Sequence, residues 1–119
     1  MVLNQKLERE TAELFKQKQY SKVIFEITSE TKQEERSAFL CNLLGLSRIA
    51  NNRNNKEFLI SAIEDFKFGY LKEKNTIHAI DGLANFITTS IFLIDLVKDY
   101  EFDFGEIFNF YKSSENFCI

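Results

Sequence analysis

Proline is absent from this 119-residue sequence, and glycine occurs only four times. Both residues interrupt regular structure, so their scarcity favours helices. So few glycines also argue against a glycine-rich loop that cradles phosphate groups. Cysteine is equally rare: Cys41 and Cys118 lie far apart and neither belongs to a CxxC pair, so a redox pair or a zinc site is not expected. We expect reduced thiols, with Cys41 as an inert residue of the helix-packing core.

Catalytic side chains are also scarce. The single histidine, His78, stands near an expected helix start, where a histidine is usually a surface or capping residue. Four carboxylates gather late in the chain, and a solvated loop accounts for them better than a cation site does. They are Asp95, Asp99, Glu101 and Asp103. We therefore expect no enzymatic activity, no cofactor and no metal site.

Long apolar runs are missing as well. The most lipid-like stretch, residues 82–97, is interrupted by Asp95 and is too short and too polar to span a bilayer. The first ten residues carry charges where a signal peptide needs apolar residues, which predicts a cytoplasmic location. The net charge is −3, with +2 over residues 1–60 and −5 over residues 61–119, so nucleic acid is not an expected partner.

Apolar residues recur at helical spacing along most of the chain, which predicts an all-α fold of about six helices. Ser37 is the expected N-cap of the third helix and Thr76 that of the fifth. Asn54 and Glu57 have the spacing of a capping box at the start of the fourth. The expected helices occupy residues 5–17, from about 21, 38–50, from about 55, 77–98 and 104–112.

The long fifth helix carries a row of apolar side chains that we expect to face the core. This row consists of Ile80, Leu83, Ala84, Ile87, Ile91 and Ile94.

The apolar pattern repeats along the chain. A step of 34 residues carries Leu7 and Thr11 of the first helix onto Cys41 and Gly45 of the third. A step of 39 residues then carries the third helix onto the fifth, and the second onto the fourth. An insertion of five residues within the polar loop between residues 48 and 59 accounts for the difference, since a surface loop lengthens at little cost.

A 34-residue helix-turn-helix period with small residues in both helices resembles the tetratricopeptide repeat. The resemblance is carried by "CNLLGLSRIA" with Gly45 in the first helix, and by "SAIEDFKFGYL" with Ala62, Phe66 and Gly69 in the second. It implies one domain over residues 1–119, a TPR-like antiparallel helix-hairpin array whose approximate repeats are 4–37, 38–76 and 77–113. The proline that commonly closes each repeat is replaced by Glu35 and Lys74. The alternative is an irregular helical bundle with a coincidental period.

The resemblance implies a non-enzymatic protein–protein interaction module. Such arrays present a concave face, built mainly from first helices, that holds a peptide or a partner's helix. The side chains expected there include Lys16, Asn42, Arg48, His78, Asp81 and Asn85. Further candidates are Gln5, Glu8, Phe15, Leu46, Ile49 and Thr88. Arg48 has an alternative interpretation, a solvated arginine whose stem covers apolar surface. A clamp for a partner's C-terminal carboxylates is not expected, because few suitable side chains face the groove.

The end of the chain is rich in aromatic residues, with five of the 13 phenylalanines in the last 18 residues. The expected sixth helix is apolar in too many directions for one buried stripe. It either folds back beside the fifth helix or packs against another chain, and a homodimer through residues 91–117 is the specific hypothesis. The expected self-association residues are Phe104, Phe108 and Tyr111. An accessory domain or fragment of a larger, transferase-like enzyme is the alternative function.

Gly45 lies in the middle of an expected helix, where glycine costs about 1 kcal/mol relative to alanine. Its repeat equivalents, Thr11 and Ala84, are also small, which indicates close helix packing at this position. Leucine at position 45 is therefore expected to destabilise the fold, whereas alanine is expected to be tolerated or mildly stabilising.

Overall fold

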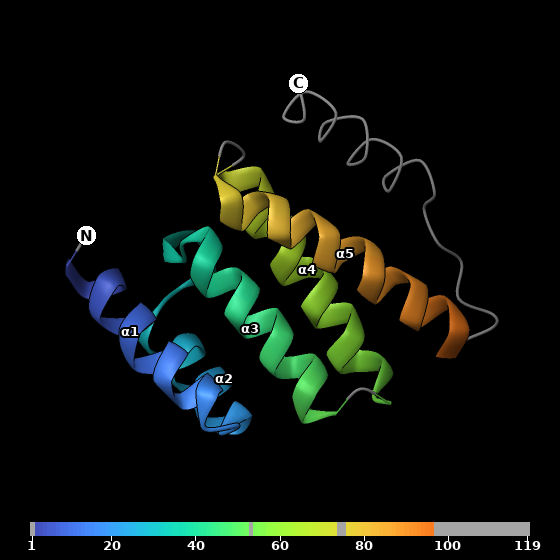
Figure 1. Cartoon of the computed structure of the whole chain (residues 1–119), viewed down its shortest axis with the longest axis horizontal. Coiled ribbons are helices and arrows are strands. Elements are labelled where there is room, and N and C mark those ends of the chain that lie inside the picture. Colours follow the sequence, from blue (N-terminus) through green and yellow to red (C-terminus); the bar gives the residue numbers. More distant parts are fainter. Residues whose placement is uncertain (1, 53, 74–75, 97–119) are drawn as a thin grey trace.

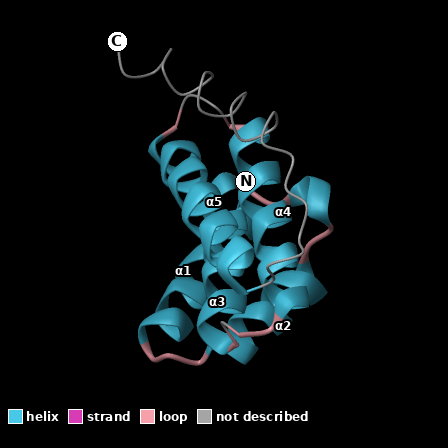
Figure 2. Cartoon of the chain, turned by 90° about the vertical axis from the view of Figure 1, so that its right-hand side faces the viewer, coloured by secondary structure: helices cyan, strands magenta, loops and turns pink. Residues whose placement is uncertain are grey.

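The computed structural model describes residues 2–52, 54–73 and 76–96, and every regular element in this part of the chain is helical (Figures 1 and 2). The elements are α1 (Val2–Lys16), α2 (Tyr20–Glu30), the single 3-10 turn η1 (Gln33–Glu35), α3 (Ala38–Asn51), α4 (Lys56–Lys72) and α5 (Ile77–Leu96). The all-α prediction is confirmed. The expected sixth helix lies outside the described residues.

Side-chain caps begin three of these helices. The Ser37 hydroxyl accepts a hydrogen bond from the Leu40 N–H at 3.2 Å, and the Thr76 hydroxyl accepts one from the Ala79 N–H at 3.1 Å, as predicted. The capping box of Asn54 and Glu57 is wrong by one residue. Asn55 is the N-cap of α4, and its side-chain oxygen accepts from the Phe58 N–H at 3.2 Å. Adjacent asparagines offer the same chemistry, so the sequence does not distinguish them.

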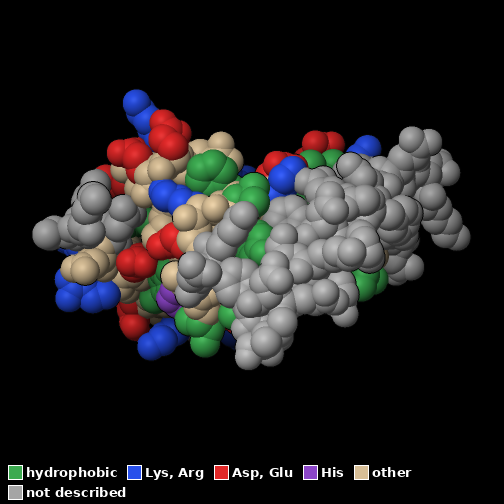
Figure 3. Space-filling model, turned by 90° about the horizontal axis from the view of Figure 1, so that it is seen from above, with side chains coloured by type: hydrophobic (Ala, Val, Ile, Leu, Met, Phe, Trp, Pro, Cys, Tyr) green, Lys and Arg blue, Asp and Glu red, His purple; other side chains and the backbone are tan. Residues whose placement is uncertain are grey.

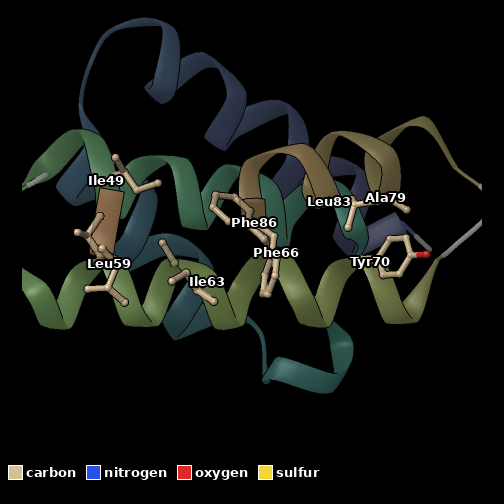
Figure 4. Close-up of a cluster of buried hydrophobic side chains, with 10 residues drawn as sticks. Ile49, Leu59, Ile63, Phe66, Tyr70, Ala79, Leu83 and Phe86 are labelled. Atoms are coloured by element: carbon tan, nitrogen blue, oxygen red, sulfur yellow. The ribbon is translucent and has the colours of Figure 1, made fainter. Parts of the chain in front are cut away.

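α3 lies at the centre of the fold and contacts each of the other four α-helices (Figure 1). One apolar cluster joins it to α1 and α2 through Leu7, Val23, Ile27, Leu40, Leu43 and Leu44. A second joins it to α4 and α5 through Ile49, Leu59, Ala62, Ile63, Phe66, Tyr70, Ala79, Leu83, Phe86 and Leu93 (Figure 4). α3 is therefore the element that both clusters share.

The contact between α3 and α4 depends on glycine. A Cβ atom built on Gly45 would lie 2.5 Å from Cε1 of Phe66, and one built on Gly69 would lie 2.8 Å from the Cβ of Cys41. Both distances are shorter than van der Waals contact. The missing side chains let the two helices approach closely, which explains the helix-propensity cost that Gly45 carries.

α5 packs with a different row of side chains from the one predicted. Leu83 is buried as expected, but Ile80 and Ile91 are 43% and 60% exposed and Ala84 is also exposed. The side chain of Ile94 lies outside the described residues. The buried row consists of Ala79, Gly82, Leu83, Phe86, Thr89, Ser90 and Leu93. α5 has apolar residues on two sides, and periodicity alone does not reveal which side faces α4.

Two polar residues fit this buried row because each finds a partner within its own helix. Thr89 donates to the Asn85 carbonyl at 2.7 Å, and Ser90 donates to the Phe86 carbonyl at 2.7 Å. Such bonds to the preceding turn satisfy the hydroxyls without water.

The geometry at Gly45 corrects the expectation that alanine is tolerated there. The Phe66 ring is fully buried, so it has no free space into which it can move away from a new methyl group. We expect Gly45→Ala to lower the free energy of unfolding by about 1–3 kcal/mol through overpacking, and Gly45→Leu to lower it further. Urea denaturation measures both.

The matched control is the same substitution in a Phe66→Leu background. Removing the ring should make Gly45→Ala less costly, because the clash disappears and the helix propensity of alanine remains. An alanine that stabilises the otherwise unchanged chain by about 1 kcal/mol would contradict this explanation.

Candidate partner-binding groove

Two hollows meet at Phe39 on the side of the molecule formed by α1, α3 and α5. The first has a volume of about 470 Å³ and is lined by Gln5, Glu8, Arg9, Ala12 and Phe39. The second, of about 360 Å³, is lined by Phe39, Asn42, Leu43, Leu46, His78, Asp81, Ala84 and Asn85. We call the two hollows together the Phe39 groove. Its volume is in the range of protein ligand sites.

Four of the six predicted partner-binding residues lie together in the second hollow: Asn42, His78, Asp81 and Asn85. Leu46 joins them, and Gln5 and Glu8 line the first hollow as predicted. Lys16 is exposed near the end of α1 and lines neither hollow. Ile49 belongs to the core beneath α4 and α5. Phe15 packs beside the other cluster, and Thr88 is exposed outside both hollows.

Phe39 is the central residue that the sequence analysis missed. It shares one side of α3 with Asn42, Leu43 and Leu46, at spacings of three, four and seven residues. Its ring stands edge-on to the His78 ring, with centroids 5.3 Å apart and an interplanar angle of 82°. The helical spacing from Leu46 and Asn42 was the signal that could have identified it.

Asn42 joins α3 to α5 at the floor of the groove. Its side-chain NH₂ donates to the His78 carbonyl at 2.6 Å, and only 8% of the residue is exposed. Its side-chain oxygen would lie 2.9 Å from a Cβ on Gly82, so glycine permits this contact. The Asn42 amide thus positions α5, which reduces what it can offer a ligand.

The charged side chains of the groove are mixed in sign. Glu8 and Arg9 belong to the first hollow and Asp81 to the second. The Glu8 carboxylate also accepts a hydrogen bond from the Ser37 hydroxyl at 3.2 Å. Asp81 is exposed and is the acidic residue among those that line the second hollow. Acidic and basic side chains are intermixed on the face drawn in Figure 3 as well.

Arg48 does not line the groove. Its Nε atom lies 2.9 Å from Oδ2 of Asp65 on α4, and the two side chains are 22% and 9% exposed. The expectation of a groove residue and the alternative of a solvated arginine are both wrong, because Asp65 draws the guanidinium toward α4. Asp65 was not among the predicted site residues, although it stands three residues after Ala62 and four before Gly69 on the row of α4 that packs against α3.

Burial raises the pKa of Asp65 from its ordinary value of 3.8 to about 7, although the neighbouring Arg48 and Arg36 lower it. Desolvation of the carboxylate therefore outweighs the attraction of the guanidinium groups. The same interface holds the free thiol of Cys41, which is 2% exposed. Burial, and then the charge of Asp65, raise the pKa of this thiol to about 12, so it stays protonated near neutral pH.

The raised pKa of Asp65 predicts a pH-dependent stability. Between about pH 4 and pH 7 the folded state binds the proton more tightly than the unfolded state, so this contribution to stability is present at low pH and is lost as the pH rises toward 7. We expect the unfolding free energy of the unchanged chain to fall relative to that of Asp65→Asn by about 1–4 kcal/mol over this window. Urea denaturation at each pH measures the difference.

Glu57→Gln is the matched control, because it removes the same charge from an exposed residue of α4 that lies about two turns before Asp65. Its stability curve should run parallel to that of the unchanged chain between pH 4 and 7. Asp65→Asn running parallel as well would show that the Asp65 carboxyl keeps its ordinary pKa in the folded protein.

Comparison of the chain with protein-family models, with curated proteins and with solved structures finds no match. Within the described residues, no three histidine, cysteine or acidic side chains come together as metal ligands would. None of the helices described is long and apolar enough to cross a lipid bilayer. The groove and its chemistry are therefore the basis for assigning a function.

Proposed function

We propose that this protein is a non-enzymatic, TPR-like interaction module that binds a peptide, or a segment of a partner protein, in the Phe39 groove. The observation that carries the proposal is the meeting of two hollows at one aromatic side chain, on the side where α1 and α5 both contact α3. A partner chain lying across α3 would reach both hollows. Phe39 would then separate two of its side chains.

The packing of the helices supports the hairpin-array interpretation. α1 contacts α2 and α3, and α3 contacts α4 and α5, so the first and third helices each contact both the next helix and the next odd-numbered one. This is the contact pattern of stacked helix hairpins, in which the first helices line the inner face. Among the described residues, those that line the groove come from α1, α3 and α5.

The side chains of the groove suggest what kind of segment would bind. Ala12, Leu43 and Leu46 offer apolar surface on either side of Phe39, which suits aliphatic or aromatic anchors of a partner. Asp81, which is exposed and lines the second hollow, suits a lysine or arginine. The preferred ligand is therefore a peptide with two apolar anchors and one basic residue, rather than one ending in acidic groups.

Selection of a displayed random-peptide library on the immobilised protein tests this proposal. We expect binders that combine apolar anchors with a basic residue, and fluorescence anisotropy gives their dissociation constants. Asn85→Arg places a long cation in the second hollow, and Ala12→Arg places one in the first. Each should weaken binding by about tenfold or more, equivalent to about 1.4 kcal/mol or more.

Ser29→Arg is the matched control, because it adds the same charge to an exposed position of α2, which lines neither hollow. It should leave the dissociation constant unchanged. Peptides that bind Asn85→Arg and Ala12→Arg as tightly as the unchanged protein would show that the groove is not the binding site.

A further inference from the structure

α5 carries an apolar stripe alongside its buried row; four of the five stripe residues are exposed, and Ile87 is half-buried against the cluster that α4 and α5 share. The stripe consists of Ile77, Ile80, Ala84, Ile87 and Ile91, at successive spacings of three, four, three and four residues. Ile77 is 69% exposed, Ile80 43% and Ile91 60%. Isolated exposed apolar residues are ordinary, but a row at this spacing is the pattern of a helix face that packs against a partner.

The repeat relates this stripe to a side of α3 that is covered. A step of 39 residues back carries Ile80, Ala84 and Ile87 onto Cys41, Gly45 and Arg48. All three lie against α4: Cys41 against Gly69, Gly45 against Phe66, and Arg48 in its ion pair with Asp65. The position equivalent to the exposed stripe is thus covered by the helix that follows α3 in the chain.

The same step relates the buried sides of the two helices. It carries Ala79 and Leu83 of α5 back onto Leu40 and Leu44 of α3. Leu40 and Leu44 pack in the cluster shared with α1 and α2, the helices before α3, while Ala79 and Leu83 pack in the cluster shared with α4, the helix before α5. α5 therefore packs one side against preceding helices as α3 does, whereas the side that corresponds to the α4-facing side of α3 carries the exposed stripe.

The equivalent side of α1 is also covered by the helix that follows it in the chain. A step of 34 residues back from Cys41 and Gly45 reaches Leu7 and Thr11, which are 4% and 0% exposed. Leu7 packs in the cluster with Val23 of α2, the helix that follows α1. In both earlier helices, then, this side belongs to the interface with the next helix of the same chain.

We propose that residues 103–112 of this chain form a helix that docks on the α5 stripe, as α2 docks on α1 and α4 on α3. The segment has Phe104, Ile107, Phe108 and Tyr111 at spacings of three, one and three residues, which places them on one helix face. Asp103 begins it with the capping-box spacing to Glu106. Phe104, Phe108 and Tyr111, which the sequence suggested for self-association, would then contact α5 of the same chain.

The short connection between α5 and residue 103 favours docking of the chain's own residues 103–112 over docking of the same residues from a second copy. Only six residues, 97–102, separate Leu96 from Asp103, so the segment is held beside α5 at an effective concentration on the order of millimolar. An antiparallel return over ten residues extends about 15 Å along α5. It therefore covers the end of the stripe near Ile91 and leaves Ile77, about 21 Å away along the helix, uncovered.

Thiol reactivity at the two ends of the stripe tests the proposal in the full chain with Cys118→Ser. The remaining native thiol, Cys41, is buried and protonated, so it contributes little to reaction with a disulfide reagent. Ile91→Cys and Ile77→Cys introduce the same residue on the same helix side, and each rate is divided by the thiolate fraction from its own pH profile, because Ile77 begins α5 and a helix N-terminus lowers the pKa of a thiol. We expect the thiol at position 91 to react about tenfold or more slowly than the thiol at position 77, at a rate that does not depend on protein concentration.

Adding Phe108→Glu to the Ile91→Cys chain should raise the rate to that of Ile77→Cys, with the helix content of α1–α5 retained in circular dichroism. If Ile91→Cys does not fold, Ile87→Cys replaces it, and its rate is compared with and without Phe108→Glu instead of with Ile77→Cys, because Ile87 is half-buried against the core in either case. Equal rates at positions 91 and 77 would overturn the proposal. Protection that weakens on dilution, together with a dimer in light scattering, would also overturn it, because the stripe would then be covered by a second copy.

Discussion

The close approach of α3 and α4 is the constraint on which the other contacts depend. Gly45 and Gly69 remove the side chains that would hold the two helices apart, and Phe66 fills the space left at Gly45. The approach encloses Cys41 and the Asp65 carboxylate, and both pKa values rise as a result. It also fixes the far side of α3, where Phe39 and Asn42 face α1 and α5. The groove is thus a consequence of how tightly the opposite side of α3 is packed.

Much of the helical architecture could be predicted from the sequence, because apolar spacing and caps such as Ser37 and Thr76 are local properties. Four predicted groove residues also came together, since the repeat register fixes which side of each helix they occupy. What could not be predicted depends on partners distant in sequence. Arg48 pairs with Asp65 seventeen residues later, and the Phe66 ring decides whether alanine fits at Gly45. Which apolar side of α5 is buried likewise depends on the helices around it.

The two surfaces proposed for interaction differ in construction. The Phe39 groove combines apolar side chains with Asp81 and with backbone held by Asn42, which suits the reversible binding of a segment that carries both apolar anchors and a basic residue. The α5 stripe is a continuous apolar row without a charged side chain among its five members. Such a surface resembles half of a domain core, as obligate interfaces do, and therefore suits an element that stays bound in the folded protein. α5 contributes to both surfaces, and they adjoin at Ala84, which lines the second hollow and belongs to the stripe.

The position of α3 in both apolar clusters also bears on how the protein responds to stress. In long helical arrays each unit contacts only its neighbours, so the ends can open while the middle stays folded. Here the two clusters share one helix, and Leu44 of one lies next to Gly45, the contact point of the other. Strain at either cluster is therefore transmitted through a single rigid element. The described part of the chain should open as one cooperative unit, so that the groove is either complete or absent.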